Sequence, residues 1–419
     1  QPRREVRRIE EPAEMSGHGL NAANLLDEAR RETGLSDFGD ASFHEPFERL
    51  VVALNTEARL NVAGYAYFGE RIRNVLITRL RAEDWFRRYP EIFEEEIHTP
   101  LVIIGLPRTG TTMMHRTISA DHRMYSPLWY EVRFPVPLPG TDFAAGTDPR
   151  IAIAEAEVNA LLEASPELAS IHPMDARGPD EEIMLLEQSF FSTVPESHAH
   201  MPEFGVWLEQ QDQLPGYAYL KRLLQFLQWQ KKRFGQQAER WILKTPHHLH
   251  FPAALFATFP DVQVLQTHRD PLQLMPSYAS MIHALNRPFS DAVGKEEVGA
   301  HWCRKWAAGM RTTLQFRDAG HEARFLDMWY EDTVRNPLDE IRRLYDFVGI
   351  DLTDQARTEM ERWREMNRRE ARPTHQYTLE EYGFTEGALA ADFREYRERY
   401  ILPRRRASAT GARAGRRRR

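Results

Sequence analysis

Cysteine is almost absent from this chain of 419 residues, which contains a single one, Cys303. One cysteine excludes an internal disulfide and every zinc site built on cysteine ligands, so we expect a reducing, cytoplasmic environment. Long apolar runs are absent as well. No segment approaches the roughly 18 to 20 apolar residues that span a bilayer. Residues 1–14 are charged and lack the apolar core of a signal peptide, so the sequence predicts neither a transmembrane segment nor secretion.

The balance of charge argues against nucleic acid as a partner. The net charge is -7, but residues 404–419 hold eight arginines and no acid, so the rest of the chain carries -15. An acidic body favours partners other than nucleic acid. We expect the basic tail, residues 403–419, to be disordered and solvated, with a weak contact to an anionic surface as the alternative. The sequence does not indicate an oligomeric state.

The spacing of apolar residues divides the remaining chain into two parts. Residues 1–95 show helical spacing and predict an N-terminal helical extension. Residues 96–402 alternate short apolar strands with helices, which predicts an α/β fold with a parallel sheet flanked by helices. We expect strands at 100–105, 241–243, 262–267 and 324–328, a helical insertion at about 151–235, and a C-terminal segment of helix, loop and helix at about 351–402. Ligands of such sheets bind beyond the carboxyl ends of the strands.

The segment after the first strand carries the sharpest local signal. It reads Gly105-Leu-Pro-Arg-Thr-Gly-Thr-Thr112 and opens a helix. A glycine-containing turn at a helix N-terminus gathers backbone N–H groups around a phosphate or sulfate. The spacing fits a Walker A loop, but Thr111 stands where a kinase or ATPase has its lysine, and the cation is Arg108 instead. This departure disfavours a nucleotide or small-molecule kinase, which stays the alternative function.

Three motifs together resemble sulfotransferases that use 3′-phosphoadenosine 5′-phosphosulfate (PAPS). Leu106–Thr112 is similar to the family's loop for the 5′-phosphosulfate. Thr267-His-Arg-Asp-Pro271, with Ser277 eight residues after its arginine, is similar to the motif for the 3′-phosphate. Trp241–His248 is similar to the family's strand that ends in a lysine. Further matches to a bacterial branch extend the resemblance over about residues 20–402.

The resemblance implies a P-loop-like fold and the transfer of a sulfuryl group from PAPS to a hydroxyl, leaving 3′-phosphoadenosine 5′-phosphate (PAP). No metal is implied. Arg108 and Lys244 would neutralise the developing charge, and Thr109, Gly110, Thr111 and Thr112 would hold the 5′-phosphate. Arg269 and Ser277 would hold the 3′-phosphate. The C-terminal segment at about 351–402 would close over the cofactor, with Arg368 and Arg372 of its basic loop helping to hold the 3′-phosphate. An ion pair with Asp270 is the alternative for Arg269.

The base that activates the acceptor hydroxyl has two sets of candidates. Glu131 resembles the glutamate base of the tyrosylprotein sulfotransferases, which also carry an arginine in the loop. His247 and His248 resemble the histidine base of the cytosolic sulfotransferases, although Pro246 is inserted before them. The acceptor itself stays open, because small-molecule, lipid and carbohydrate hydroxyls all fit this chemistry. A homologue that binds PAP or PAPS without catalysis is a further alternative.

Overall fold

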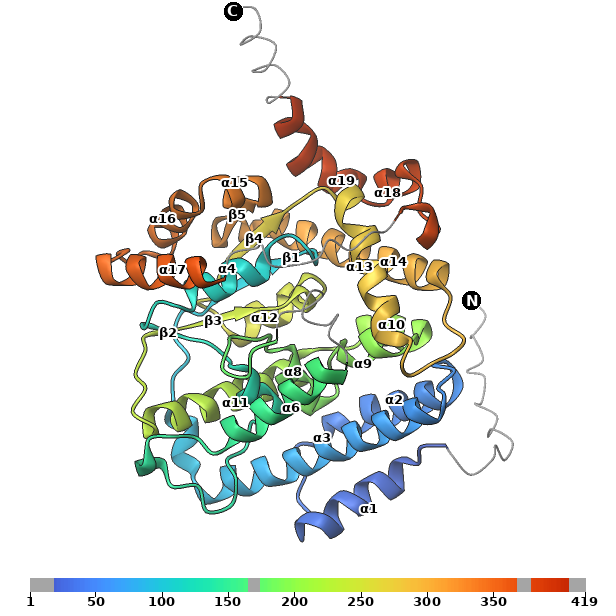
Figure 1. The fold of residues 1–419 in the computed structure, drawn as a ribbon, viewed down its shortest axis with the longest axis vertical. Helices are drawn as coiled ribbons and strands as arrows, with labels where there is room; N and C mark the ends of the chain where they lie inside the picture. Colours follow the sequence, from blue (N-terminus) through green and yellow to red (C-terminus); the bar gives the residue numbers. More distant parts are fainter. Residues whose placement is uncertain (1–18, 165–173, 368–377, 407–419) are drawn as a thin grey trace, which may run out of the picture.

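A parallel sheet of five strands lies at the centre of the protein (Figure 1). A computed structural model describes residues 19–164, 174–367 and 378–406. The strands run in the order β2-β3-β1-β4-β5 and are all parallel. Their bounds are Leu101–Gly105 (β1), Met124–Tyr125 (β2), Arg240–Lys244 (β3), Gln263–His268 (β4) and Phe325–Trp329 (β5). The predicted α/β fold is confirmed, and each predicted strand forms within one residue of its expected bounds.

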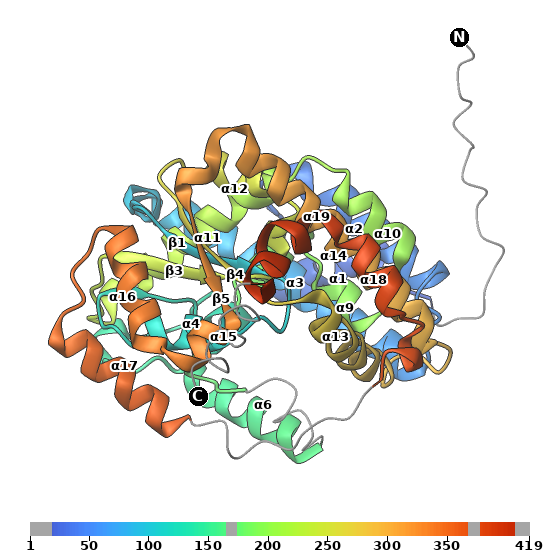
Figure 2. The same cartoon turned by 90° about the horizontal axis from the view of Figure 1, so that it is seen from above.

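Both faces of the sheet are buried, which explains the continuous apolar runs in its strands. Leu101 and Ile103 of β1 face one cluster, which includes α4 (Thr111–Ile118), α16 (Pro337–Val348) and α17 (Asp354–Met366). Val102 and Ile104 face the other cluster. Its helices are α11 (Leu214–Arg233), α12 (Pro252–Thr258), α13 (Pro271–Asn286) and α14 (Lys295–Phe316). Figure 2 shows α4, α16 and α17 on one side of the sheet and α11 and α12 on the other.

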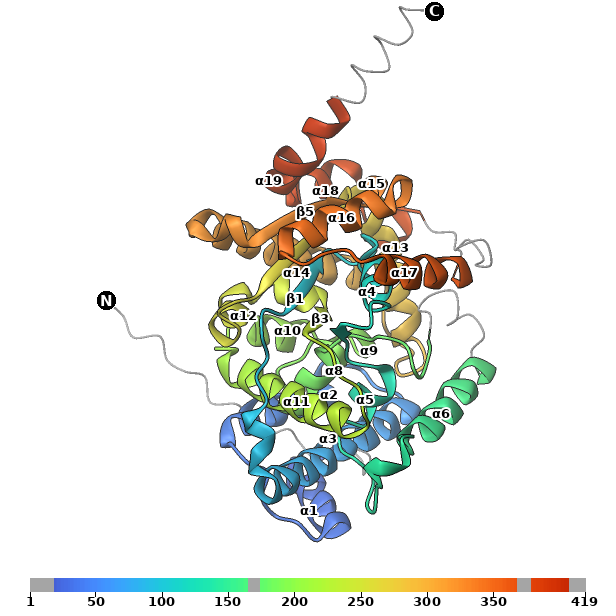
Figure 3. The same cartoon turned by 90° about the vertical axis from the view of Figure 1, so that its left-hand side faces the viewer.

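The predicted N-terminal helices form and build a core of their own. They are α1 (Ala22–Thr33), α2 (His44–Thr56) and α3 (Val62–Arg88). Asn61 caps α3 by accepting a hydrogen bond from the backbone N–H of Gly64 at 2.9 Å. Most of their buried apolar residues pack against Phe190 and Phe204, whereas Ala82 and Phe86 near the end of α3 join the cluster that covers the sheet. The three helices therefore lie at the end of the molecule opposite α18 (Glu386–Asp392) and α19 (Arg394–Tyr396) (Figures 1 and 3).

The segment between β2 and β3 is mostly helical, and one stretch of it returns to the sheet. Its helices are α5 (Trp129–Arg133), α6 (Arg150–Ala164), α8 (Ile183–Leu186), α9 (Val194–His198), α10 (Pro202–Glu209) and α11. Pro179 forms a β-bridge with Leu128. The backbone N–H of Asp180 donates to the Pro127 carbonyl at 2.9 Å. These contacts hold the stretch before α8 against the residues that follow β2. Glu182, at the end of the stretch, accepts the backbone N–H of Lys244 at the end of β3, where the candidate site lies.

The chain after β5 continues through α15 (Tyr330–Arg335) to the C-terminal helices. Residues 403–406, which we assigned to a disordered tail, continue the last helix. Arg404 pairs with Asp332 at 2.5 Å, and Arg405 pairs with Asp270 at 2.9 Å. These ion pairs explain why the helix runs further than the composition indicates. Residues 407–419 of the predicted tail lie outside the described residues.

Candidate functional site

The loop between β1 and α4 has the backbone of an anion-binding turn. Gly105, Arg108 and Gly110 adopt positive φ angles of 154°, 69° and 86°. The Thr109 hydroxyl donates to the Leu106 carbonyl at 2.6 Å and shares a hydrogen bond of 2.7 Å with the Thr267 hydroxyl, which ties the loop to β4. Gly110 opens α4 from the left-handed region. Left-handed residues at a helix N-terminus turn successive N–H groups toward one point, where phosphate or sulfate binds.

Gly110 is required for a second reason, which is the close approach of Tyr330. A Cβ atom on Gly110 would lie 3.0 Å from Cδ2 of Tyr330, the first residue of α15. No larger residue fits there without moving the ring, and a positive φ disfavours any residue with a Cβ. Thr111 is buried at the start of α4, and Thr112 is partly exposed beside it. The loop, α4 and the residue after β5 thus form one wall of the site.

Lys244 reaches this loop from the end of β3. Its Nζ donates to Oγ1 of Thr112 at 3.4 Å, and its side chain is 2 % exposed. The same ammonium pairs with the carboxylate of Glu181. The loop Gly105–Thr112, which we call the phosphate loop, and the strand that ends in Lys244 are two of the three sequence motifs. They therefore meet at the carboxyl edge of the sheet, where ligands of such folds bind.

The third motif meets the loop through Arg269, which follows β4. Nη1 of Arg269 donates to the Arg108 carbonyl at 3.0 Å, and the guanidinium lies 4.3 Å from the centre of the Tyr330 ring. Asp270 instead accepts hydrogen bonds from Arg397, the nearer at 3.1 Å, and caps α13. The alternative of a surface pair between Arg269 and Asp270 is therefore wrong. Ser277 lies two helical turns into α13 and is partly exposed. Arg368 and Arg372 lie outside the described residues.

Glu131 has a set of contacts apart from the phosphate loop. It pairs with Lys231 at 2.7 Å, and the two side chains are 2 % and 3 % exposed. Its second oxygen accepts the backbone N–H of Leu128 at 2.8 Å, which caps α5. Nζ of Lys231 lies 5.9 Å from the centre of the Trp241 ring. The pair therefore lies beside the first half of β3, whereas Lys244 ends that strand.

His247 and His248 are both buried with 0 % of their surface exposed. Nδ1 of His248 lies 2.6 Å from the Tyr217 hydroxyl, and its Nε2 lies 2.8 Å from a carboxylate oxygen of Glu182. Burial, reinforced by the neighbouring charge of His248, holds the pKa of His247 well below its usual range. A base must come within hydrogen-bond reach of the proton it removes. Neither ring presents surface to an acceptor in this conformation.

Two glutamates that precede α8 reach Lys244, and no sequence motif predicted them. Glu181 touches Lys244, and Glu182 accepts the backbone N–H of Lys244 at 2.8 Å. Both come from the middle of the helical insertion, more than 60 residues before the lysine that they contact. The only sequence signal is the sequence Arg177-Gly-Pro-Asp-Glu-Glu182, a turn followed by carboxylates. No local pattern connects that turn with the end of β3.

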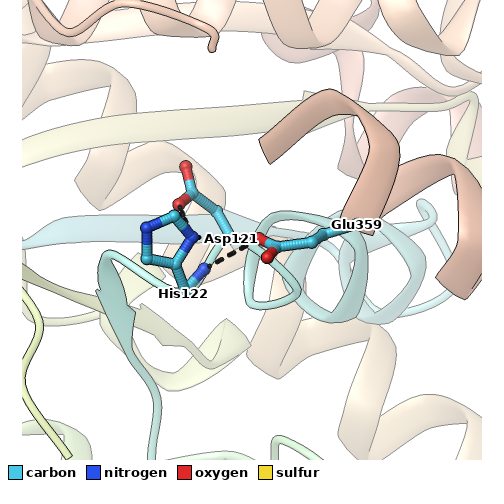
Figure 4. Close-up of side chains that lie close together, drawn as sticks. All are labelled: Asp121, His122 and Glu359. Carbon is cyan, nitrogen blue, oxygen red and sulfur yellow. Dashed lines mark hydrogen bonds and ion pairs between the residues drawn. The ribbon is translucent and has the colours of Figure 1, made fainter. Parts of the chain in front are cut away.

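One group of potential metal ligands occurs among the described residues, at the end of α4 (Figure 4). It consists of Asp121, His122 and Glu359. Asp121 already accepts hydrogen bonds from Arg123 and from the Tyr345 hydroxyl at 2.7 and 2.8 Å. Glu359 lies 3.1 Å from Nδ1 of His122. These contacts account for the group as a network that ties α4 to α17.

No helix in the described parts of the chain has both the length and the apolar surface needed to cross a bilayer.

Comparison with known proteins identifies the family. The model of the sulfotransferase family matches residues 100–354, which include the phosphate loop, Lys244 and Arg269. The chain belongs to the sulfotransferase family. The resemblance inferred from the three motifs is thereby confirmed.

Mycobacterial sulfotransferases are similar over much of the chain. The structure of sulfotransferase STF1 from Mycobacterium tuberculosis is 30 % identical, with a TM-score of 0.78 over 89 % of this chain and 98 % of that one. Sulfotransferase STF9 from Mycobacterium avium is 27 % identical, with a TM-score of 0.82 over 91 % and 97 %. The omega-hydroxy-beta-dihydromenaquinone-9 sulfotransferase Stf3 of Mycobacterium bovis is 25 % identical over 263 residues, which are 60 % of this chain and 63 % of that protein. The chain thus matches less than two thirds of the length of this curated relative.

Proposed function

We propose that this protein transfers a sulfuryl group from PAPS to the hydroxyl of a small, lipid-like or carbohydrate acceptor. One observation carries the proposal: three separate motifs converge on the phosphate loop. Lys244 reaches Thr112 from β3, and Arg269 reaches the Arg108 carbonyl from β4. A kinase loop would carry a lysine at position 111, where this chain has threonine. The name of the menaquinone-related relative supports a small lipid-like acceptor.

The residues of the site fit a donor that carries phosphate groups at the 5′ and 3′ positions of its ribose. The left-handed loop residues and the start of α4 suit the 5′-phosphosulfate, because a helix N-terminus stabilises negative charge. Arg269 offers a planar fork of N–H donors that matches phosphate oxygens, and it donates a hydrogen bond to the loop. Ser277 would add a hydroxyl from α13. These residues would hold PAPS, which supplies the sulfuryl group and leaves as PAP.

The side chains around the loop would act by position and charge. The transfer resembles other in-line displacements with a loose transition state, in which charge builds on the departing oxygen. Lys244 is well placed to stabilise that charge because its ammonium is buried and hydrogen-bonded to Thr112. Arg108 extends from the loop and is exposed, so it would approach the transferred group from the solvent side. Cationic side chains fixed in this way would lower the barrier to sulfuryl transfer, and this scheme requires no metal ion.

A transfer assay tests the proposal. Labelled PAPS would be offered with a long-chain alcohol, a phenol and a sugar, and labelled product counted after separation. We expect transfer to at least one acceptor, and a fall of 10²- to 10³-fold in Lys244→Ala, the usual effect of removing one stabiliser of transition-state charge. Phosphorylation of the same acceptors from ATP, with no sulfation, would contradict the proposal and favour the kinase alternative.

A further inference from the structure

Glu181 is a partly exposed carboxylate at the edge of the phosphate loop. It pairs with Nζ of Lys244, the ammonium that also donates to Thr112 at 3.4 Å. The Glu181 side chain is 22 % exposed, whereas that of Lys244 is 2 % exposed. The carboxylate is therefore connected to Thr112 through Lys244, and part of its surface stays accessible to an acceptor molecule.

The fold fixes Glu181 from both sides. On one side, the Asp180 N–H donates to the Pro127 carbonyl at 2.9 Å, next to the end of β2. On the other side, one carboxylate oxygen of Glu182 accepts the Lys244 N–H at 2.8 Å and the other lies 2.8 Å from Nε2 of His248. Glu182 is 0 % exposed, so this clamp is buried. The position of Glu181 beside Lys244 follows from the backbone, rather than from a loose surface contact.

The other candidates for the base are not both partly exposed and in contact with Lys244. Glu131 has both oxygens engaged, with Lys231 and with the N–H of Leu128, and is 2 % exposed. His247 and His248 have no exposed surface. A general base needs hydrogen-bond access to the acceptor hydroxyl and a site next to the reacting centre. Among these four residues, Glu181 alone meets both conditions.

We propose that Glu181 is the general base that receives the proton of the acceptor hydroxyl, an inference that rests on the proposed sulfotransferase function. The acceptor oxygen forms a bond to sulfur while the bond between sulfur and the oxygen of the donor's 5′-phosphate breaks. The electron pair of the broken bond stays on that phosphate, beside Lys244, and the hydroxyl proton passes to a carboxylate oxygen of Glu181. Glu181 and Lys244 thus serve opposite ends of one displacement while they touch each other.

The substitution Glu181→Gln keeps the size of the side chain and removes the base. We expect the rate of transfer at saturating substrate to fall by about 10² to 10⁴, the usual contribution of a general base. Affinity for PAP, measured by calorimetry, should stay the same or increase, because the neutral amide no longer repels the phosphate. A matched control is Glu157→Gln. Glu157 is also partly exposed and pairs with an arginine, Arg133 at 2.9 Å, but lies outside the site. It should retain both the rate and the affinity.

Two results would overturn the inference. A normal rate in Glu181→Gln would exclude Glu181 as the base. A loss of PAP affinity as large as the loss of rate would show that Glu181 only positions Lys244. If the amide variant does not fold, Glu181→Asp draws the carboxylate back by one methylene. It should slow transfer at least tenfold with PAP affinity retained, and a wild-type rate would again exclude the role. Failure of the wild-type protein to bind PAP would contradict the proposed function itself, which separates the two claims.

Discussion

The hydroxyl of Tyr396, in the C-terminal helix α19, accepts a hydrogen bond from the backbone N–H of Arg269 at 3.3 Å. The same hydroxyl lies 3.2 Å from Nδ1 of His268, whose Nε2 lies 2.7 Å from Asp327. Although burial alone would raise it, hydrogen bonds from His268 and Arg317 lower the pKa of Asp327. A charged network therefore links β5 and the C-terminal helix to the backbone of Arg269, the residue that we propose binds the 3′-phosphate.

Tyr396→Phe should weaken binding of PAP while leaving adenosine 5′-phosphate binding unchanged. The variant loses one hydrogen bond to the Arg269 backbone, which is worth about 0.5 to 1.5 kcal/mol, so we expect a two- to tenfold rise in the dissociation constant by calorimetry. Tyr400→Phe is the matched control, because the hydroxyl of Tyr400 is buried and has no hydrogen-bond partner among the described residues. An equal loss for both nucleotides, or the same loss in the control, would argue against a positioning role.

Arg269→Ala tests the 3′-phosphate contact directly. Removing a hydrogen bond to a charged group costs about 1.5 to 3 kcal/mol, so the affinity for PAP should fall by about 10- to 150-fold. Arg269→Lys should recover part of the loss, since it keeps the charge but not the planar fork. Adenosine 5′-phosphate lacks the 3′-phosphate and should bind all three proteins alike. If its affinity falls as far as that of PAP, Arg269 does not recognise the 3′ end.

Glu131→Gln should destabilise the fold. The substitution leaves the ammonium of Lys231, 3 % exposed, without its partner, and breaking a buried pair in this way costs about 3 to 5 kcal/mol. Urea unfolding would measure the loss. The double variant Glu131→Gln with Lys231→Met should recover much of it, since no buried charge is left unpaired. Intact stability combined with a loss of turnover in the single variant would restore Glu131 as the base.

The stability of the protein should fall as the pH drops below about 6.5, in part because of His250. Burial, followed by the charge of Lys305, lowers the pKa of His250 from 6.5 to about 3. Between these two values the unfolded chain holds the proton and the folded chain does not, so acid favours unfolding. One such group contributes about 1.4 kcal/mol per pH unit. Urea unfolding at pH 7, 6 and 5 gives the free energy of unfolding of the wild-type protein and of His250→Gln. The decrease in this free energy per pH unit should be larger in the wild-type protein by about 1.4 kcal/mol. Equal decreases would mean that His250 is protonated in the folded state.

The sequence predicted the strands of the sheet and the turn between β1 and α4 because both are encoded locally. A strand such as Leu101–Gly105 is a continuous apolar run, and the loop that follows carries its own glycines and cation. Arg269 was identified for the same reason, since it directly follows a strand. The ends of parallel strands meet at one edge, so residues at those ends are brought together by topology alone.

The parts of the site that the sequence did not predict depend on contacts between distant segments. Glu181 reaches Lys244 from 63 residues away, and Tyr396 reaches Arg269 from 127 residues away. Periodicity describes which face of an element is buried, but not which other segment covers it. The two-residue strand β2 is too short to give a pattern. Glu131 was selected for its place after the loop, whereas a lysine at the end of α11 determines its contacts.

Calorimetric titration of the purified protein with PAP, ATP and adenosine 5′-phosphate would show which nucleotide the protein binds. Lys244 and Arg269 both contact the phosphate loop, and we propose that the three together bind a nucleotide that carries both a 5′- and a 3′-phosphate. We expect micromolar binding of PAP, with both other nucleotides at least tenfold weaker. Binding of ATP in preference to PAP would contradict the account and replace the sulfuryl donor with a nucleoside triphosphate.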